Sequence, residues 1–226
     1  MAQQNNPYYT STTEQASNYP TLDKQIEGDV CVVGGGYAGL SSAIHLAKTG
    51  LDVVLLEAHT IANGASGRNG GHLSPMAVHG PIGLEKVVGV ENARKIWDLS
   101  EAAKRLVNGL IQENGIQCDT KSGFMIAAAS AEDAKELSAE VKRFREDYQY
   151  ETVQKVSKSE ISEMFGTDIY HGGLYDPSII RVNPLQFAHG MANTAKAAGV
   201  KIFEQSEVLQ YSADSNVIVK TSRGQV

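Results

Sequence analysis

Cysteine is scarce in this chain of 226 residues. Only Cys31 and Cys118 occur, and their spacing matches no metal site. Such sparse use of cysteine favours a reducing, cytoplasmic setting. Long apolar runs are also missing, and none approaches the ~20 residues that a membrane-spanning helix needs. The first thirteen residues lack the basic and apolar regions of a signal peptide. We therefore predict a soluble, cytoplasmic protein.

Basic residues are outnumbered by acidic ones. The 20 Lys and Arg residues against 26 Asp and Glu residues give a formal net charge of −6. A nucleic-acid partner would need a basic surface to neutralise phosphates, so this balance disfavours one. It also excludes a polybasic membrane anchor. With 42% hydrophobic residues, a chain of this length buries enough apolar surface to form a globular fold.

The first patterned segment predicts a βαβ unit. Residues Asp29–Val33 form a short apolar run that is typical of a buried parallel strand. Residues Tyr37–Thr49 have apolar residues at helical spacing, and Gly50 follows as a left-handed stop. Residues Asp52–Leu56 form a second buried strand. The order of strand, tight turn, helix and strand is that of a parallel crossover.

A glycine motif lies at the turn of this unit. Gly34, Gly36 and Gly39 form G-x-G-x-x-G between the strand and the helix, the context that the motif requires. The three glycines permit a tight turn, a close approach of pyrophosphate, and close helix–strand packing. Glu57 follows the second strand, eighteen residues beyond Gly39, near the spacing at which a carboxylate accepts ribose hydroxyls. The alternative is a glycine-rich turn with a chance acidic residue, and we favour the dinucleotide site.

The motif alone does not separate FAD from NAD, but the next segment does. Residues 60–73 read TIANGASGRNGGHL, and residues 31–58 read CVVGGGYAGLSSAIHLAKTGLDVVLLEA. Together they resemble the FAD-dependent D-amino-acid oxidase superfamily, and most of all its γ-glutamylputrescine oxidase-type amine oxidases. The segment GLYDPSIIRVNP at residues 173–184 is similar to the family's return to its FAD domain.

The resemblance implies a set of cofactor-binding residues. The turn and second strand supply Gly34, Gly36, Tyr37, Ala38, Gly39, Glu57 and Ala58, and the inner half of FAD is expected against Ser66, Arg68, Asn69, Gly70, Gly71 and His72. Val208 is expected to contact the adenine through its backbone. His72 is open to roles as a polar contact, a proton-handling group or a covalent attachment point, and an ordinary hydrogen-bonded histidine is the favoured interpretation. Arg181 is open to meeting a substrate anion, although a solvated loop charge is favoured.

Other patterns predict further elements without chemistry. A long helix over residues 91–114 carries an apolar stripe that we interpret as core. Ser130 and Asp133 resemble a capping box, and Asn183 with Pro184 is typical of a helix start. His45 and His189 fall in predicted helices. Strands are expected at residues 123–128, 169–175 and 201–204, with a hairpin over 207–211 and 217–221.

These elements predict an α/β fold with four segments. Residues 1–27 form a polar arm, residues 28–115 and 183–226 form a Rossmann-like FAD-binding domain, and residues 116–182 enter part of a mixed-sheet substrate domain. Members of the family are longer, and their later half completes the substrate sheet and closes over the flavin. The resemblance therefore indicates a truncated chain, which is a fragment, a shortened gene product or one piece of a two-chain enzyme.

The function implied by the resemblance is that of an oxidase. An amine or amino acid loses a hydride to flavin N5, and the resulting imine and hydrogen peroxide require molecular oxygen. The expected partners are the small-molecule substrate, oxygen, and either a second chain or the missing C-terminal half, with no nucleic acid, no membrane and no metal. No residue is singled out as catalytic. The alternatives are a non-catalytic fragment that binds FAD or ADP, and an NAD-dependent dehydrogenase, which would leave the GASGRNGG loop unexplained.

Overall fold

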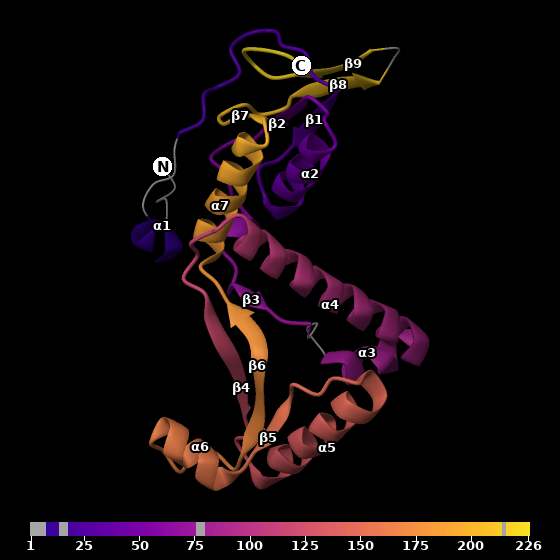
Figure 1. Cartoon of the computed structure of the whole chain (residues 1–226), viewed down its shortest axis with the longest axis vertical. Coiled ribbons are helices and arrows are strands. Elements are labelled where there is room, and N and C mark those ends of the chain that lie inside the picture. The colour runs from indigo at the N-terminus through magenta and orange to yellow at the C-terminus, as the bar shows by residue number, and fades with distance from the viewer. Residues whose placement is uncertain (1–7, 14–17, 76–79, 214–215) are drawn as a thin grey trace. The chain divides into compact units, whose positions relative to one another are not determined.

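The computed structural model describes residues 8–13, 18–75, 80–213 and 216–226 (Figure 1). These residues form two compact units. Unit 1 comprises the described residues of Met1–Gly71, Leu110–Asp119 and Asn183–Val226. Unit 2 comprises those of His72–Gly109 and Thr120–Val182. Among the helices in these ranges, none is long and apolar enough to cross a membrane.

Unit 1 is built on a three-stranded parallel sheet. Strands β1 (Val30–Val33), β2 (Val53–Leu56) and β7 (Lys201–Phe203) lie in the order β1-β2-β7. All four residues of β2 are buried, as expected for the central strand of a parallel sheet. Helix α2 (Tyr37–Lys48) connects β1 to β2, and α7 (Pro184–Ala197) packs against α2. The predicted βαβ unit and the α/β fold are confirmed.

Residues 19–26 lie against residues 204–225 in unit 1. The short helix α1 (Tyr8–Thr12) precedes a segment in which Leu22 is fully buried. The N–H of Leu22 donates to Ser206 Oγ at 2.9 Å, and Gln25 forms a β-bridge with Gln225. Strands β8 (Gln210–Ala213) and β9 (Val217–Lys220) form the predicted hairpin. The N-terminal segment is therefore fixed to the last part of the chain.

Unit 2 contains an antiparallel sheet around one long strand. Strand β6 (Gly173–Arg181) pairs with β4 (Lys121–Ala127) on one side and with β3 (His72–Leu73) and β5 (Gln154–Val156) on the other. We expected a strand over residues 169–175, and this prediction is wrong at both ends. The strand continues through Pro177 because residues 177–179 bulge opposite Gly123 alone, and a bulge tolerates the missing N–H of proline.

Four helices accompany this sheet. They are α3 (Gly80–Val88), α4 (Val90–Glu113), α5 (Ala131–Tyr148) and α6 (Lys158–Phe165), and α4 continues into unit 1 from residue 110. The predicted capping box of Ser130 and Asp133 is confirmed, and Ser157 with Glu160 forms a second one at the start of α6. Helices α3 and α6 were not predicted from the sequence, since both are short.

An aromatic cluster joins α4 to α5. Trp97 of α4 lies with its ring centroid 5.5 Å from Phe144, 5.2 Å from Tyr148 and 5.0 Å from Tyr150. Val141, Val153 and Leu174 complete the cluster. The apolar stripe predicted on α4 is not buried in this cluster at two of its residues. Leu99 is 70% exposed and Leu106 is 47% exposed. The interpretation of that stripe as core is therefore wrong for these two residues, whereas Leu110, which belongs to the same stripe, is only 5% exposed.

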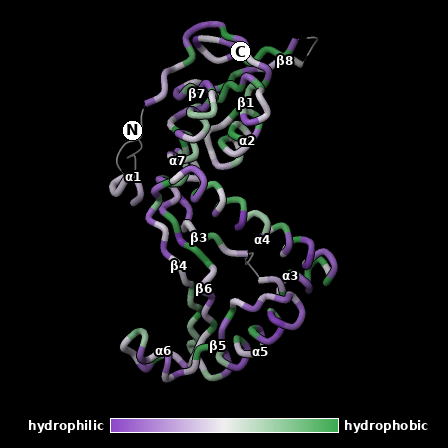
Figure 2. The backbone as a smooth tube through the Cα atoms, in the orientation of Figure 1, coloured by the Kyte–Doolittle hydropathy of each residue, from purple (hydrophilic) through white to green (hydrophobic). Residues whose placement is uncertain are grey.

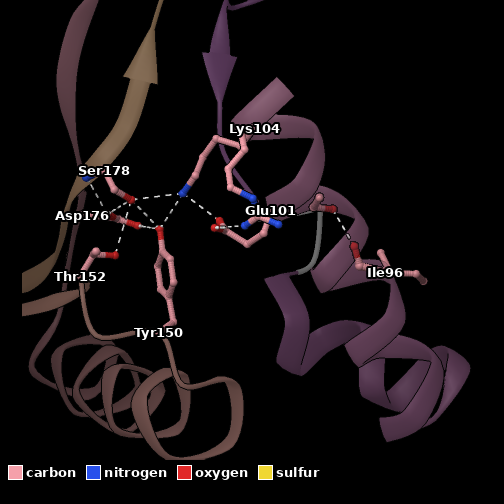
Figure 3. A network of polar contacts seen from close by, with 9 residues as sticks. Ile96, Glu101, Lys104, Tyr150, Thr152, Asp176 and Ser178 are labelled. Carbon is pink, nitrogen blue, oxygen red and sulfur yellow. Dashed lines mark hydrogen bonds and ion pairs between the residues drawn. The ribbon is translucent and has the colours of Figure 1, made fainter. Parts of the chain in front are cut away.

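A polar network holds the same helix to the sheet (Figure 3). The carboxylate of Asp176 is fully buried and accepts hydrogen bonds from Tyr150 Oη at 2.6 Å and Ser178 Oγ at 2.8 Å. Lys104 Nζ donates to Tyr150 and Ser178, both at 3.3 Å, and lies 2.7 Å from Glu101 Oε1. Although burial lowers it, the pKa of Lys104 is raised overall by Glu101 and Tyr150. Lys104 therefore stays charged within the network.

A second polar contact in unit 2 involves a carboxylate, and we expect its contribution to stability to depend on pH. Glu85 of α3 accepts hydrogen bonds from Arg143 Nη2 at 2.7 Å and Tyr148 Oη at 2.8 Å. The hydrogen bond from Arg143 holds the pKa of Glu85 below its usual range. The ionised carboxylate therefore contributes stability above the unfolded-state pKa of about 4.3, and this contribution is lost as the pH falls through the lower folded-state pKa.

We expect Glu85→Gln to destabilise the protein at pH 7, and the difference from the wild type to shrink as the pH falls through the lowered folded-state pKa of Glu85. Urea denaturation followed by circular dichroism at several pH values measures the difference in free energy of unfolding between the variant and the wild type, called the gap below. Glu132→Gln is the matched control, because its carboxylate lies on α5 and is 74% exposed. A gap that stays constant from pH 7 to pH 3 would contradict the assignment.

Candidate functional site

The glycine turn joins β1 to α2 in unit 1. The N–H of Gly34 donates to the carbonyl of Leu56 at 2.8 Å, so the turn begins against the end of β2. Gly34 has a φ of +103°, which side chains rarely adopt. A Cβ atom at Gly39 would lie 1.9 Å from the carbonyl oxygen of Gly34. Both positions therefore require glycine, the first for its backbone conformation and the second for close packing.

The N-terminus of α2 has no capping side chain from its own N-cap residue. Gly36 precedes the helix and provides no capping side chain, and the first turn has no acidic residue. The N–H of Tyr37 donates to Ser66 Oγ at 3.0 Å, so the loop after β2 contacts the start of this helix. A Cβ at Gly36 would lie 2.9 Å from Ser66 Oγ. The remaining first-turn N–H groups and the helix dipole attract an anion at this point.

Glu57 lies directly after β2, beside the turn. Its Oε2 accepts the N–H of Gly35 at 2.6 Å, and its Oε1 accepts the N–H of His59 at 2.9 Å. Its backbone N–H donates to the carbonyl of Phe203, the last residue of β7, and its carbonyl accepts the N–H of Ser206, which lies beyond that strand. A carboxylate has about four acceptor positions, so two contacts leave capacity for ligand hydroxyls.

The loop after Glu57 is held by its own side chains. Asn69 Nδ2 donates to the carbonyls of Ala65 and Ser66 at 3.1 and 3.0 Å, and its Oδ1 accepts the N–H of Gly71 at 2.8 Å. The 3₁₀ turn Ala65–Gly67 lies at its centre. Arg68 is exposed and only a 3.5 Å contact joins its Nη2 to Asn63. Asn69 therefore shapes the loop, and Arg68 extends from it.

The structure brings some of the expected site residues together and leaves others apart. The glycine turn, Tyr37, Glu57 and Ser66 are linked by the contacts above. Ala38 and Gly70 are exposed, and Ala58 is half-buried. Val208 packs beside the cluster of Leu22, Val54, Leu56 and Val219. Each of these residues belongs to unit 1.

His72 and Arg181 belong to unit 2. His72 begins β3, is paired in register with Arg181, and has its ring 5.5 Å from that of Phe124. Arg181 is the last residue of β6, so the expectation of a loop position is wrong. In unit 1, His45 is exposed on α2, whereas burial lowers the pKa of His189 on α7. The described residues contain no group of three metal-ligating side chains.

Sequence reasoning missed Glu204, the counterpart of Glu57 on the next strand. Glu204 is only 6% exposed, and its Oε1 accepts the N–H of Ile61 at 2.7 Å while its Oε2 accepts that of Tyr19 at 3.3 Å. It therefore fixes both the loop after β2 and the N-terminal segment. The available signal was positional, since a glutamate follows each of two parallel strands at the same sheet edge.

Comparisons with known proteins identify the family of the chain. The family model for FAD-dependent oxidoreductases, abbreviated DAO, matches residues 29–226. The chain is 34% identical over its whole length to gamma-glutamylputrescine oxidoreductase of Escherichia coli, covering 53% of that protein. It is 33% identical over 220 residues to a probable oxidoreductase of Haemophilus influenzae, covering 97% of the chain and 51% of the relative.

A solved structure gives the same result for the fold. Glycine oxidase from Geobacillus kaustophilus superposes with a TM-score of 0.67 at 26% identity, over 88% of this chain and 52% of that one. The chain thus spans about half the length of the relatives it matches, and the matched part is the N-terminal half of the Escherichia coli protein. On its glycine turn, its acidic residue after β2 and its match over residues 29–226, the chain belongs to the DAO family of FAD-dependent oxidoreductases.

Proposed function

We propose that unit 1 binds FAD and that the chain is part of an oxidoreductase acting on the C–N bond of an amine or amino acid. The observation that carries the proposal is the arrangement of the glycine turn, the start of α2 and Glu57. The residues fit the ADP half of FAD, because a Cβ at Gly39 would displace the turn and no side chain of Gly36 covers the helix start.

Each residue of the turn has a defined part in this proposal. The N–H groups at the start of α2 bind the pyrophosphate, with Gly36 permitting the approach and Tyr37, Ala38 and Ser66 beside it. Glu57 accepts the ribose hydroxyls, and this favours FAD over a 2′-phosphorylated nucleotide. Ala58 and the backbone of Val208 lie toward the adenine, while the loop through Arg68, Asn69, Gly70 and Gly71 runs along the inner half of FAD. For His72 we keep the favoured interpretation of an ordinary hydrogen-bonded histidine.

The substrate class comes from the relatives. The Escherichia coli relative acts, by its name, on gamma-glutamylputrescine, and the Geobacillus structure is a glycine oxidase. Bound FAD would supply the acceptor for a hydride from the carbon beside the substrate nitrogen, giving an imine, with molecular oxygen as the final acceptor and hydrogen peroxide as product. We propose unit 2 as part of the substrate domain, and the chain's own contribution as binding and orienting the cofactor.

The test begins with the cofactor. We expect the purified chain, incubated with FAD and passed through gel filtration, to retain flavin that acid precipitation releases. Anaerobic addition of amines or amino acids should bleach the visible absorbance of this bound flavin. Retained FAD without bleaching would favour a non-catalytic binding fragment, and retention of NAD in place of FAD would contradict the assignment.

A variant pair tests the role of Glu57. Glu57→Gln keeps the shape but loses charge-assisted acceptance from the ribose, so we expect FAD affinity to fall roughly 10–100-fold. Glu207→Gln makes the same change of charge at an exposed position of the same unit and should bind FAD like the wild type. Equal affinities of the two variants would refute the assigned contact.

A further inference from the structure

The exposed part of the apolar stripe of α4, called the apolar stripe below, consists of Leu99, Ala103 and Leu106 and faces away from the core of unit 2, whereas Leu110 further along the helix is buried. All three residues are exposed, and Leu99 and Leu106 lie two turns apart, about 10 Å along the axis. Figure 2 shows hydrophobic residues recurring along α4 between hydrophilic ones. A helix normally directs such a stripe at a partner, because exposed apolar surface of this kind marks an interaction site.

The orientation of α4 is fixed by its opposite face. At about 100° per residue, positions 97, 101 and 104 lie nearly opposite positions 99, 103 and 106. Trp97 is only 5% exposed within the aromatic cluster, and the side chain of Lys104 is 9% exposed within the polar network (Figure 3). Turning the stripe inward would remove both from these contacts. Unit 2 therefore cannot bury the stripe by itself.

We propose that the apolar stripe of α4 is the docking surface for polypeptide equivalent to the C-terminal half of the family's members. The relatives are about twice as long as the part that this chain matches, and the chain matches the N-terminal half of the Escherichia coli protein. Those proteins therefore have a further stretch of comparable length to cover such a surface. The proposal depends on the family membership and is independent of the proposed reaction.

The charges of α4 argue against a lipid surface as the occupant. The helix has four acidic and four basic side chains, so its polar surface has no net charge. A helix that binds anionic membranes has a polar face rich in lysine and arginine. The small side chains of Ala102 and Ala103 beside the two leucines permit the close approach of packed protein segments.

Cysteine labelling tests the proposal. Leu99→Cys is made in this chain and in the same chain joined to the second half of the Escherichia coli gamma-glutamylputrescine oxidoreductase. Met164→Cys is the matched control, since Met164 is 55% exposed on α6 of the same unit. The parent gives the background rate, because Cys31 is half-buried and Cys118 is buried. The measurement is the rate of reaction with a maleimide.

We expect both cysteines to react rapidly in the chain alone. In the joined protein, Leu99→Cys should react at least about 10-fold more slowly, whereas Met164→Cys keeps its rate. If the joined protein retains no flavin, the labelling is repeated on this chain mixed with the separately produced half. Absence of protection in both formats overturns the proposal. Slow labelling of Leu99→Cys in the chain alone also overturns it, and if the protection rises with concentration the stripe is an interface between copies.

Discussion

Replacing Trp97 by alanine is expected to lower the free energy of unfolding of unit 2 by about 3–5 kcal/mol. The indole ring lies within 5.5 Å of the ring centroids of Phe144, Tyr148 and Tyr150, so its removal leaves a cavity lined by three rigid aromatic rings. Such rings cannot collapse into the space without losing their own contacts. Urea denaturation followed by far-UV circular dichroism measures the loss, because Trp97 is the single tryptophan and its fluorescence disappears with it.

Leu99→Ala is the control for this prediction, two residues along the same helix. Because Leu99 is 70% exposed, we expect its truncation to change the free energy of unfolding by no more than about 0.5 kcal/mol. Alanine and leucine have similar helix propensities, so the effect of Leu99→Ala reports the burial of the side chain. Comparison of the two variants therefore distinguishes the buried face of α4 from the exposed one. A larger loss for Leu99→Ala than for Trp97→Ala would reverse the orientation that we describe.

The second large effect is expected at Gly39. Within an exposed helix, glycine to alanine would stabilise by about 1 kcal/mol. At Gly39 the new Cβ would lie 1.9 Å from the carbonyl oxygen of Gly34, an atom of the backbone that cannot move aside. We therefore expect Gly39→Ala to destabilise unit 1 by about 3 kcal/mol or more and to abolish the retention of FAD.

Ser42→Ala is the matched control for Gly39→Ala, because it introduces the same residue at an exposed position of the same helix. It should keep or slightly raise the stability and retain FAD like the wild type. Thermal unfolding and the visible spectrum after gel filtration measure both variants. A Gly39→Ala protein that is more stable than the wild type would show that helix propensity outweighs the contact with Gly34.

Much of unit 1 could be predicted from local sequence signals. The strand over residues 30–33, the glycine turn and helix α2 follow one another within twenty residues, and each boundary has its own residue signal. Asn183 similarly caps α7 through the N–H groups of Leu185 and Gln186, as its place before Pro184 predicted. These features depend on neighbours in sequence, and short patterns describe them well.

Unit 2 was harder to predict because distant residues decide it. The course of β6 through Pro177 depends on a bulge opposite Gly123, which lies more than fifty residues away in sequence. The buried face of α4 depends on Trp97 and Lys104 meeting α5 and β6, and the more regular apolar stripe gives the opposite answer. Periodicity identifies an apolar face but does not say which partner covers it.

The candidate site also has some residues that the sequence predicts locally and others that depend on contacts with distant residues. The glycines and Glu57 are recognisable because the motif fixes both residue type and spacing. The loop-shaping contacts of Asn69 and the buried anchor Glu204 depend on backbone N–H groups that only the folded chain brings near. The binding experiments on Glu57→Gln and Gly39→Ala test the proposed contacts of the glycine turn and Glu57 with FAD.

The pairing of β2 with β7 has a consequence for synthesis on the ribosome. Residues 53–56 cannot gain their neighbour until residues 201–203 have been synthesised, and Leu22 is made still earlier and waits for Ser206. The segments of unit 2 emerge before then. Nascent unit 1 therefore keeps an apolar strand with a free edge throughout elongation, and a chaperone that shields such edges should associate with it until β7 emerges.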